Sequence, residues 1–145
     1  MTLMELLVVL SIIAAVVGMS VPAMTRYSGQ ARLKTTVRQM AGFLSLARSL
    51  SIGSQSGHTV LADTEHRRMT VTDNTSGEVL EQQLRLPQGM DVTLESGGET
   101  LTPAEIAFQP SGSLRSGRAV SVILKDGQKR ATITISGITG AVTVE

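Results

Sequence analysis

The sequence predicts an α+β fold, in which a long N-terminal helix packs by its second half on a C-terminal antiparallel β domain. Residues 1–54 carry apolar side chains that suit a helix, at spacings of three and four residues in the second half, whereas from residue 58 onward apolar and polar side chains alternate as in strands. The chain has 145 residues, which suits one small domain with an apolar segment before it.

The first half of the predicted helix is apolar and carries one charged side chain. The carboxylate of Glu5 is the only side-chain charge before Arg26. The run is long enough for a membrane-spanning helix, which needs roughly 20 apolar residues. A carboxylate beside such a run is costly in lipid unless it has a partner. We therefore expect Glu5 to pair with a cation of another chain, the alternative being a solvated carboxylate at the level of the lipid headgroups.

Two residues are expected to weaken this helix, Gly18 and Pro22. Proline has no amide hydrogen, so the turn before Pro22 should kink or loosen. Such residues could let the helix stretch when it leaves a membrane, or they are simply tolerated, as in many spanning helices. A cleavable secretory signal is disfavoured, because no basic residue precedes the apolar run.

Beyond Pro22 the helix becomes amphipathic. An apolar stripe at helical spacing predicts packing on one face of a sheet, and its members are Leu33, Val37, Met40, Leu44, Ala47 and Leu50. Glycine and serine residues at 53–57 end the helix. The predicted divisions are a transmembrane or filament-core helix at 1–25, an amphipathic helix at 26–54 and a β domain at 55–145.

The β domain is predicted from short alternating segments separated by Gly, Pro, Asn and Asp. These segments are His58–Asp63, Arg67–Asp73, Glu78–Leu86, Met90–Glu95, Glu105–Gln109, Arg118–Lys125, Lys129–Ser136 and Ala141–Glu145. The turn Asp126-Gly127-Gln128 is typical of a hairpin. Short connections favour antiparallel pairing, and the segment 96–99 is expected to be a loop.

No pattern of residues predicts an enzyme. The chain has no cysteine, and it contains no glycine-rich phosphate loop or nucleophile elbow. His58 and His66 lack companions at metal-ligand spacing, so we expect them to be surface or packing residues and expect no metal or cofactor. The segment Asp73–Glu78 is expected to be a turn and not a calcium loop. A tethered periplasmic enzyme is therefore disfavoured.

Basic residues gather in two parts of the chain. Every charged residue between Glu5 and Asp63 is basic, which predicts a solvated helix face or a surface for acidic lipids, acidic neighbours or nucleic acid. A second group could bind a ligand such as DNA and comprises Arg115, Arg118, Lys129 and Arg130. DNA binding is disfavoured, because the net charge is only +1 and no aromatic residue accompanies this group for base stacking.

The opening sequence Met-Thr-Leu-Met-Glu-Leu-Leu-Val-Val-Leu resembles the mature N-terminus of type IV pilins and type II secretion pseudopilins. The resemblance implies that a prepilin peptidase, which is also an N-methyltransferase, cuts before Met1 and methylates it. It also implies that Glu5 pairs with the N-terminal amine of a neighbouring subunit. Met1 departs from the commoner phenylalanine of the class, and an ordinary initiator methionine is the alternative.

The rest of the chain resembles the GspH/FimT-like minor pseudopilins. The carriers are Leu46-Ala47-Arg48-Ser49, the segment Ile106–Gly112 and the segment Ile133–Gly137. This implies a structural minor pseudopilin of the bacterial inner membrane, single-pass, with its C-terminal domain in the periplasm. Its partners would be membrane lipid before assembly and then other subunits, by helix bundling in a type II secretion pseudopilus or its tip.

Two alternatives stay open within the same class of protein. One is a minor pilin of a type IV pilus, in a DNA-binding or competence-related role. The other is a major filament subunit. DNA-binding members of the family resemble one another in arginines near the C-terminus, and the segment Gly137–Ala141 has none.

Overall fold

The computed structural model describes the backbone of residues 2–145 and the side chains of residues 2–18 and 30–145. One helix, α1, extends from Leu3 to Gly53. The chain divides into two compact units, Met1–Arg32 and Leu33–Glu145. The described part of the first unit is helical from Leu3 onward, and the second unit contains the end of α1 and all the strands of the described chain.

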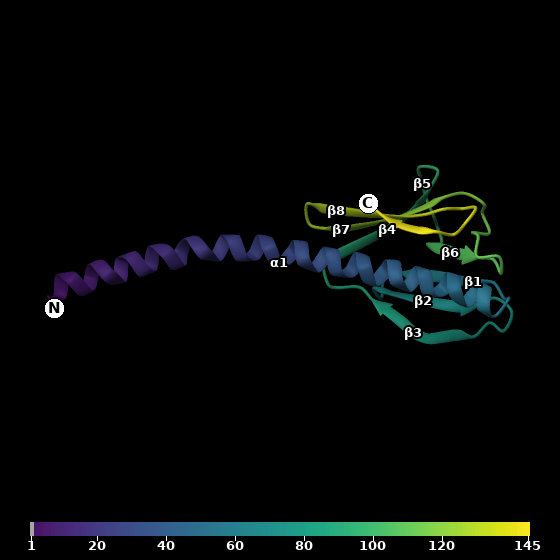
Figure 1. The fold of residues 1–145 in the computed structure, drawn as a ribbon, viewed down its shortest axis with the longest axis horizontal. Helices are drawn as coiled ribbons and strands as arrows, with labels where there is room; N and C mark the ends of the chain where they lie inside the picture. Colours follow the sequence, from purple (N-terminus) through teal and green to yellow (C-terminus); the bar gives the residue numbers. More distant parts are fainter. Residues whose placement is uncertain (1) are drawn as a thin grey trace. The chain divides into compact units, whose positions relative to one another are not determined.

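The strands of residues 2–145 form two antiparallel sheets (Figure 1). One sheet has the order β3-β2-β1-β6 and is built from β1 (His58–Asp63), β2 (Arg68–Asp73), β3 (Val79–Arg85) and β6 (Glu105–Phe108). The other has the order β5-β4-β7-β8-β9 and is built from β4 (Met90–Ser96), β5 (Glu99–Thr100), β7 (Val120–Asp126), β8 (Lys129–Ile135) and β9 (Val142–Val144).

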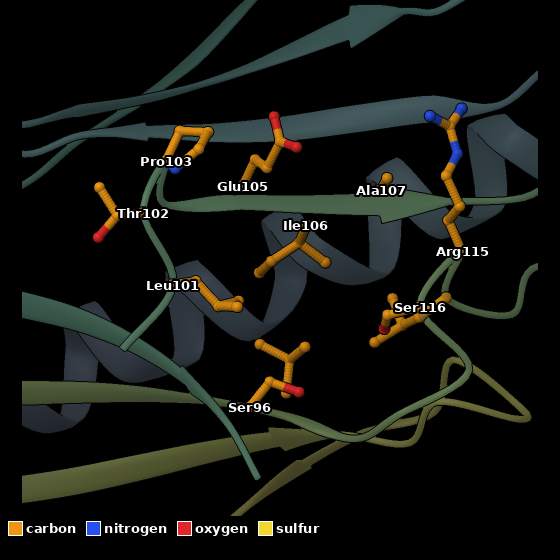
Figure 2. A pocket seen from close by; sticks show the side chains of 11 residues that line it. Ser96, Leu101, Thr102, Pro103, Glu105, Ile106, Ala107, Arg115 and Ser116 are labelled. Atoms are coloured by element: carbon orange, nitrogen blue, oxygen red, sulfur yellow. The ribbon is translucent and has the colours of Figure 1, made fainter. Parts of the chain in front are cut away.

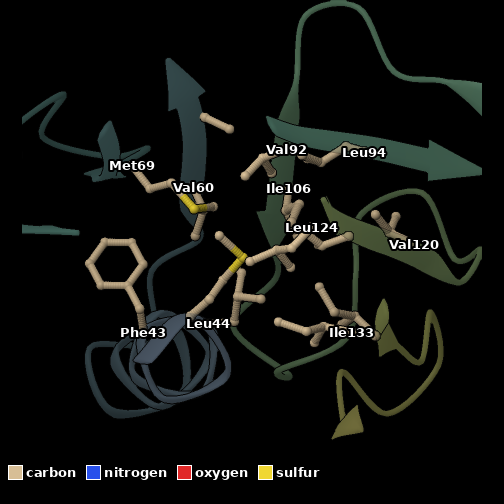
Figure 3. Close-up of a cluster of buried hydrophobic side chains, with 14 of the residues drawn as sticks. Phe43, Leu44, Val60, Met69, Val92, Leu94, Ile106, Val120, Leu124 and Ile133 are labelled. Carbon is tan, nitrogen blue, oxygen red and sulfur yellow. The ribbon is translucent and has the colours of Figure 1, made fainter. Parts of the chain in front are cut away.

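The core of the second unit joins α1 to both sheets (Figure 3). Met40 and Leu44 of α1 are fully buried with Phe108 of the first sheet and Leu124 of the second. Each such side chain contributes about 1.5–3 kcal/mol by leaving water. The apolar stripe of the helix is therefore the common cover of two sheets.

The α+β fold class is confirmed, and so is the packing of the second half of the helix on antiparallel strands. Two details differ from the prediction. The stripe was expected to cover one sheet face, but the strands form two sheets, because β1 pairs with β6 and β4 pairs with β7 across long stretches of chain. The expected loop at 96–99 contains the start of the short strand β5, which forms a tight hairpin with β4.

Two glycines allow the last loop of the chain to lie directly against the loop after β6. Gly140 has a φ of +64°, and a Cβ added there would overlap the carbonyl oxygen of Gly112. A Cβ at Gly137 would overlap the carbonyl of Gly117. The amide of Leu114 donates to the carbonyl of Gly137 at 2.9 Å. Only residues without a side chain permit this approach.

Candidate functional site

The first sixteen residues of α1 present an apolar surface that the described chain leaves uncovered. Eleven large side chains there expose between 50% and 82% of their surface: Leu3, Met4, Leu6, Leu7, Val8, Val9, Leu10, Ile12, Ile13, Val16 and Val17. Soluble monomers rarely expose an apolar surface of this extent. The hydroxyl of Ser11 donates to the carbonyl of Val8 at 2.7 Å, so this polar group is satisfied within the helix itself.

A helix that crosses a membrane must be both long enough and apolar enough to span the hydrocarbon core. Within the residues whose side chains are described, no helical stretch is both long enough and apolar enough to cross a bilayer.

Glu5 lies in the first turn of α1, where its backbone amide takes part in a helix cap that the sequence interpretation missed. The amide of Glu5 donates to the hydroxyl of Thr2 at 3.3 Å, and the amide of Leu6 donates to the carbonyl of Thr2 at 3.3 Å. Thr2 is thus the N-cap, and Glu5 occupies the third helical position, where the pattern Thr-x-x-Glu matches the sequence of a capping box. The pattern Thr-x-x-Glu in the sequence was the signal from which this helix cap could have been predicted. A carboxylate there also suits the positive end of the helix dipole.

The carboxylate of Glu5 is not ion-paired within the part of the chain that the structure describes, which excludes Met1. Met1, the predicted processing site, lies outside the described residues. Gly18 lies within α1 and is exposed, and a Cβ added there would meet nothing within 4 Å. The side chain of Pro22 also lies outside the described residues. The predicted roles of Glu5, Gly18 and Pro22 stay predictions.

The four basic residues near the C-terminus do not form one cluster. Lys129 and Arg130 begin β8, where they pair with Asp126 and Lys125 at the turn of the β7–β8 hairpin. Arg115 and Arg118 precede β7, whose first residue pairs with the last residue of β8. Six residues of strand, about 20 Å at 3.3 Å per residue, separate the two pairs.

The two histidines lie in different environments. His58 is buried, and its Nδ1 lies 3.0 Å from the carbonyl oxygen of Ser56, which makes it a packing residue. His66 is exposed beside Asp63, with Nδ1 2.9 Å from a carboxylate oxygen. Hydrogen bonds from the backbone amide of His66, then from its ring, hold the pKa of Asp63 below its usual value. No group of metal-ligating side chains occurs among the described residues.

Asp73 organises the turn between β2 and β3, which confirms the expectation of a turn at this position. One carboxylate oxygen accepts hydrogen bonds from the hydroxyl of Ser56 and from the amide of Thr75, both at 2.7 Å. These bonds favour the ionised carboxylate and lower the pKa of Asp73. The bond to Ser56 also ties the turn to the chain that follows α1.

Comparisons with solved structures identify the class of fold to which this arrangement belongs, that of minor pilins and pseudopilins. The type IV minor pilin FimU of Pseudomonas aeruginosa superposes with a TM-score of 0.65 at 13% identity, over 82% of this chain and 92% of that one. The minor pseudopilin EpsH from the type 2 secretion system of Vibrio cholerae superposes with a TM-score of 0.64 at 14% identity, over 79% of this chain and 96% of that one. At such identities the likeness shows a shared fold.

Neither family profiles nor curated protein sequences give a match to this chain.

Proposed function

We propose that the chain is a structural minor pseudopilin that assembles through its N-terminal helix into a type II secretion pseudopilus or its tip, and that it is not an enzyme. The observation that carries this proposal is the apolar surface of residues 3–17, which is exposed along the first part of α1. The shared fold with a minor pilin and a minor pseudopilin supports it. In a filament, equivalent helices would cover this surface.

In this proposal the N-terminal helix occupies two environments, first the membrane and then the filament. Before assembly, residues 1–25 would lie in the inner membrane as a single-pass anchor, with the β domain in the periplasm. A prepilin peptidase and N-methyltransferase would process the chain before Met1. In the filament, the carboxylate of Glu5 would face the amine of a neighbouring Met1, and Gly18 and Pro22 would let the helix lengthen as it leaves the lipid.

The experiment compares two substitutions at Glu5, because a glutamate three residues after the N-cap Thr2 is also in the position from which a side chain can complete a capping box. Glu5→Gln removes the charge and keeps a side chain that can complete the capping box with Thr2. Glu5→Ala removes both. If the charge sets assembly, both variants lose filament incorporation, since an uncompensated buried charge costs about 3–5 kcal/mol. Membrane insertion should stay unchanged in both.

Incorporation can be measured by cross-linking, since the chain has no natural cysteine. A single cysteine in place of Val9 or Ile13 would form disulfides only between subunits whose helices lie side by side. Wild-type incorporation of Glu5→Gln with loss for Glu5→Ala would assign Glu5 to helix capping. Normal cross-linking of both variants would show that the pairing role is wrong.

A minor pilin of a type IV pilus is the second candidate, because the FimU likeness is as extensive as the EpsH likeness. A DNA-binding version would use the exposed pair Arg115 and Arg118 or the hairpin pair Lys129 and Arg130. Binding of duplex DNA by the full chain in detergent, with a steep loss of affinity at higher salt, would support it. Absence of DNA binding at low salt would rule out the DNA-binding version of this candidate.

A further inference from the structure

Two clefts of the second unit differ in charge. One has a volume of about 350 Å³ and an apolar floor that includes Leu101 and Ile106 (Figure 2). Its charged lining residues are one acid, Glu105, and one base, Arg115, which Figure 2 shows on the same side of β6. The other cleft has a volume of about 370 Å³, and its lining contains three arginines and no acidic residue. We call it the arginine cleft, after Arg67, Arg68 and Arg85.

The arginine cleft lies where the β1–β2 turn meets the end of β3. The amide of Leu86 donates to the carbonyl of Arg67 at 2.8 Å, so these two residues form a hydrogen-bonded pair. Such pairs alternate along antiparallel strands, so Arg68 and Arg85, which are opposite each other, form the next pair, in which side chains lie closer together. Like charges directly opposite each other destabilise a sheet. The pairing of Arg68 with Arg85 is therefore unfavourable unless an anion lies between them.

The chain itself compensates only one of the three positive charges. The Nε of Arg68 donates to the carboxylate of Asp63 at 3.3 Å. The side chains of Arg67 and Arg85 are exposed, and among the described residues they have no ion pair or hydrogen bond. Arg67 also borders a smaller cleft that contains Asp91, but no ion pair joins these two described side chains. The arginine cleft thus has two uncompensated positive charges.

The backbone of Arg67 gives a second indication of a binding role. Its φ is +50°, in the left-handed region that glycine and asparagine adopt most easily. Residues that keep such a strained conformation are concentrated at binding and active sites. Since a glycine would form the same turn with less strain, the turn itself does not explain an arginine at this position. Its side chain lines the cleft together with that of Arg85.

The charge and the donors of the cleft indicate the chemistry of its ligand. Guanidinium groups bind phosphate oxygens through paired N–H bonds. A phosphate monoester carries a charge of about −1.5 to −2 at pH 7, which balances two arginines. A carboxylate or a phosphate diester carries a single negative charge and would leave one arginine uncompensated. Gln83 lines the same cleft, and its amide group can donate a further hydrogen bond to a phosphate oxygen.

We propose that the arginine cleft binds a phosphate monoester group. Arg67 and Arg85 hold the phosphate oxygens, while Arg68 keeps its bond to Asp63. The bound dianion removes the repulsion between the opposite arginines of β2 and β3. The cleft has room for the phosphate and for part of the group that it esterifies. The proposal does not depend on filament assembly.

The probe is glycerol 2-phosphate, titrated into the isotope-labelled full chain in detergent and in a buffer without phosphate. The side-chain Nε–H resonances of Arg67 and Arg85 should shift saturably at millimolar concentrations, because both gain an anionic acceptor. Dimethyl phosphate and acetate, added at the same ionic strength, should bind about fivefold more weakly, because each carries a single charge. Equal affinity for the three anions, or no shift at either arginine, would overturn the proposal.

A short-chain phosphatidic acid distinguishes the two sources of such a group, because it presents a phosphate monoester on a lipid. Tighter binding than that of glycerol 2-phosphate would support a lipid headgroup as the ligand. Equal or weaker binding would support a soluble phosphate ester. Arg67→Gly controls for partition of the lipid into detergent, since binding in the arginine cleft must weaken in this variant.

Protein variants separate binding from folding. Arg67→Gly should weaken binding of glycerol 2-phosphate about tenfold, as expected for a lost charge-assisted hydrogen bond, and should keep or raise the thermal midpoint, because glycine suits the positive φ. Arg85→Gln should weaken binding similarly and raise the midpoint in the absence of phosphate. The matched control is Arg130→Gln, because Arg130 also lies opposite a cation, Lys125, which has Asp91 on its other side. Unchanged affinity of Arg67→Gly, or an equal loss for Arg130→Gln, would overturn the proposal.

Discussion

The two ends of α1 carry similar apolar residues, but these side chains are exposed near the N-terminal end and buried near the C-terminal end. Between Leu3 and Val17, large apolar side chains are at least half exposed, whereas Met40 and Leu44 are fully buried by the two sheets. In the second half, polar residues interrupt the apolar ones at helical spacing, so one stripe can be covered by the same chain. In the first half, apolar residues occur all round the helix, and the described part of the chain leaves those of residues 3–17 uncovered.

The largest expected effect breaks the core of the β domain. Phe108→Ala should lower the free energy of unfolding by about 3–5 kcal/mol, because a fully buried aromatic side chain leaves a cavity between the helix and both sheets. Leu10→Ala, a truncation in the exposed segment, should change it by less than about 0.5 kcal/mol. Urea unfolding of the full chain in detergent measures both values. A similar loss for Leu10→Ala would show that the first half of the helix is covered within the chain.

The second-largest expected effect comes from a substitution where the loops after β6 and β8 approach each other closely. Gly140→Ala should cost about 1–3 kcal/mol, because it combines a positive φ with overlap on the carbonyl of Gly112. Gly127→Ala is the matched control, with a φ of +61° and no atom within 4 Å of the added Cβ. It should cost only the backbone strain, about 1–2 kcal/mol. Thermal unfolding measures the stability loss of both variants. Equal losses would mean that the two loops move apart at little cost in free energy.

Acid should weaken the β domain through its turn carboxylates. Native hydrogen bonds lower the pKa of Asp73 and Asp63 below the ordinary value of 3.8. Because the unfolded chain binds protons first, this stabilisation is fully present above pH 3.8 and is lost as pH falls through the lower native pKa values. Unfolding midpoints from pH 6 to pH 2 measure the slope. Asp73→Asn should flatten it, and Asp91→Asn, on an exposed part of β4, should not.

The sequence predicted the elements of the fold well and their pairing less well. The period of two located β1 and β8 to within a residue, because each has one buried face. The division into two sheets could not be read in this way. It depends on pairings such as β1 with β6, in which residues almost fifty positions apart meet, and local alternation carries no information about them. The two-residue strand β5 is too short to show any period.

The candidate sites were predicted unevenly for a similar reason. The exposed apolar segment follows from composition alone, whereas the grouping of Arg115 with Lys129 fails in space, since a hairpin places residues near in sequence at opposite ends of a sheet. The N-cap at Thr2 could have been predicted from the pattern Thr-x-x-Glu, but the apolar run that follows favoured an interpretation of Glu5 in terms of lipid.

The smallest expected effect concerns the first turn of the helix, and it tests whether this turn is stabilised independently of the β domain. Thr2→Ala removes the hydroxyl that accepts the amide of Glu5, and loss of an N-cap costs about 0.5–2 kcal/mol locally. Because the first turn frays independently of a distant core, hydrogen exchange at the amides of Glu5 and Leu6 should accelerate about fivefold, while urea unfolding of the β domain stays unchanged. Thr2→Ser, which keeps the hydroxyl, should leave both as they were. If Thr2→Ala also shifted the unfolding of the β domain, the two parts of the chain would be one cooperative unit, and their contrast would lie in surface chemistry and not in stability.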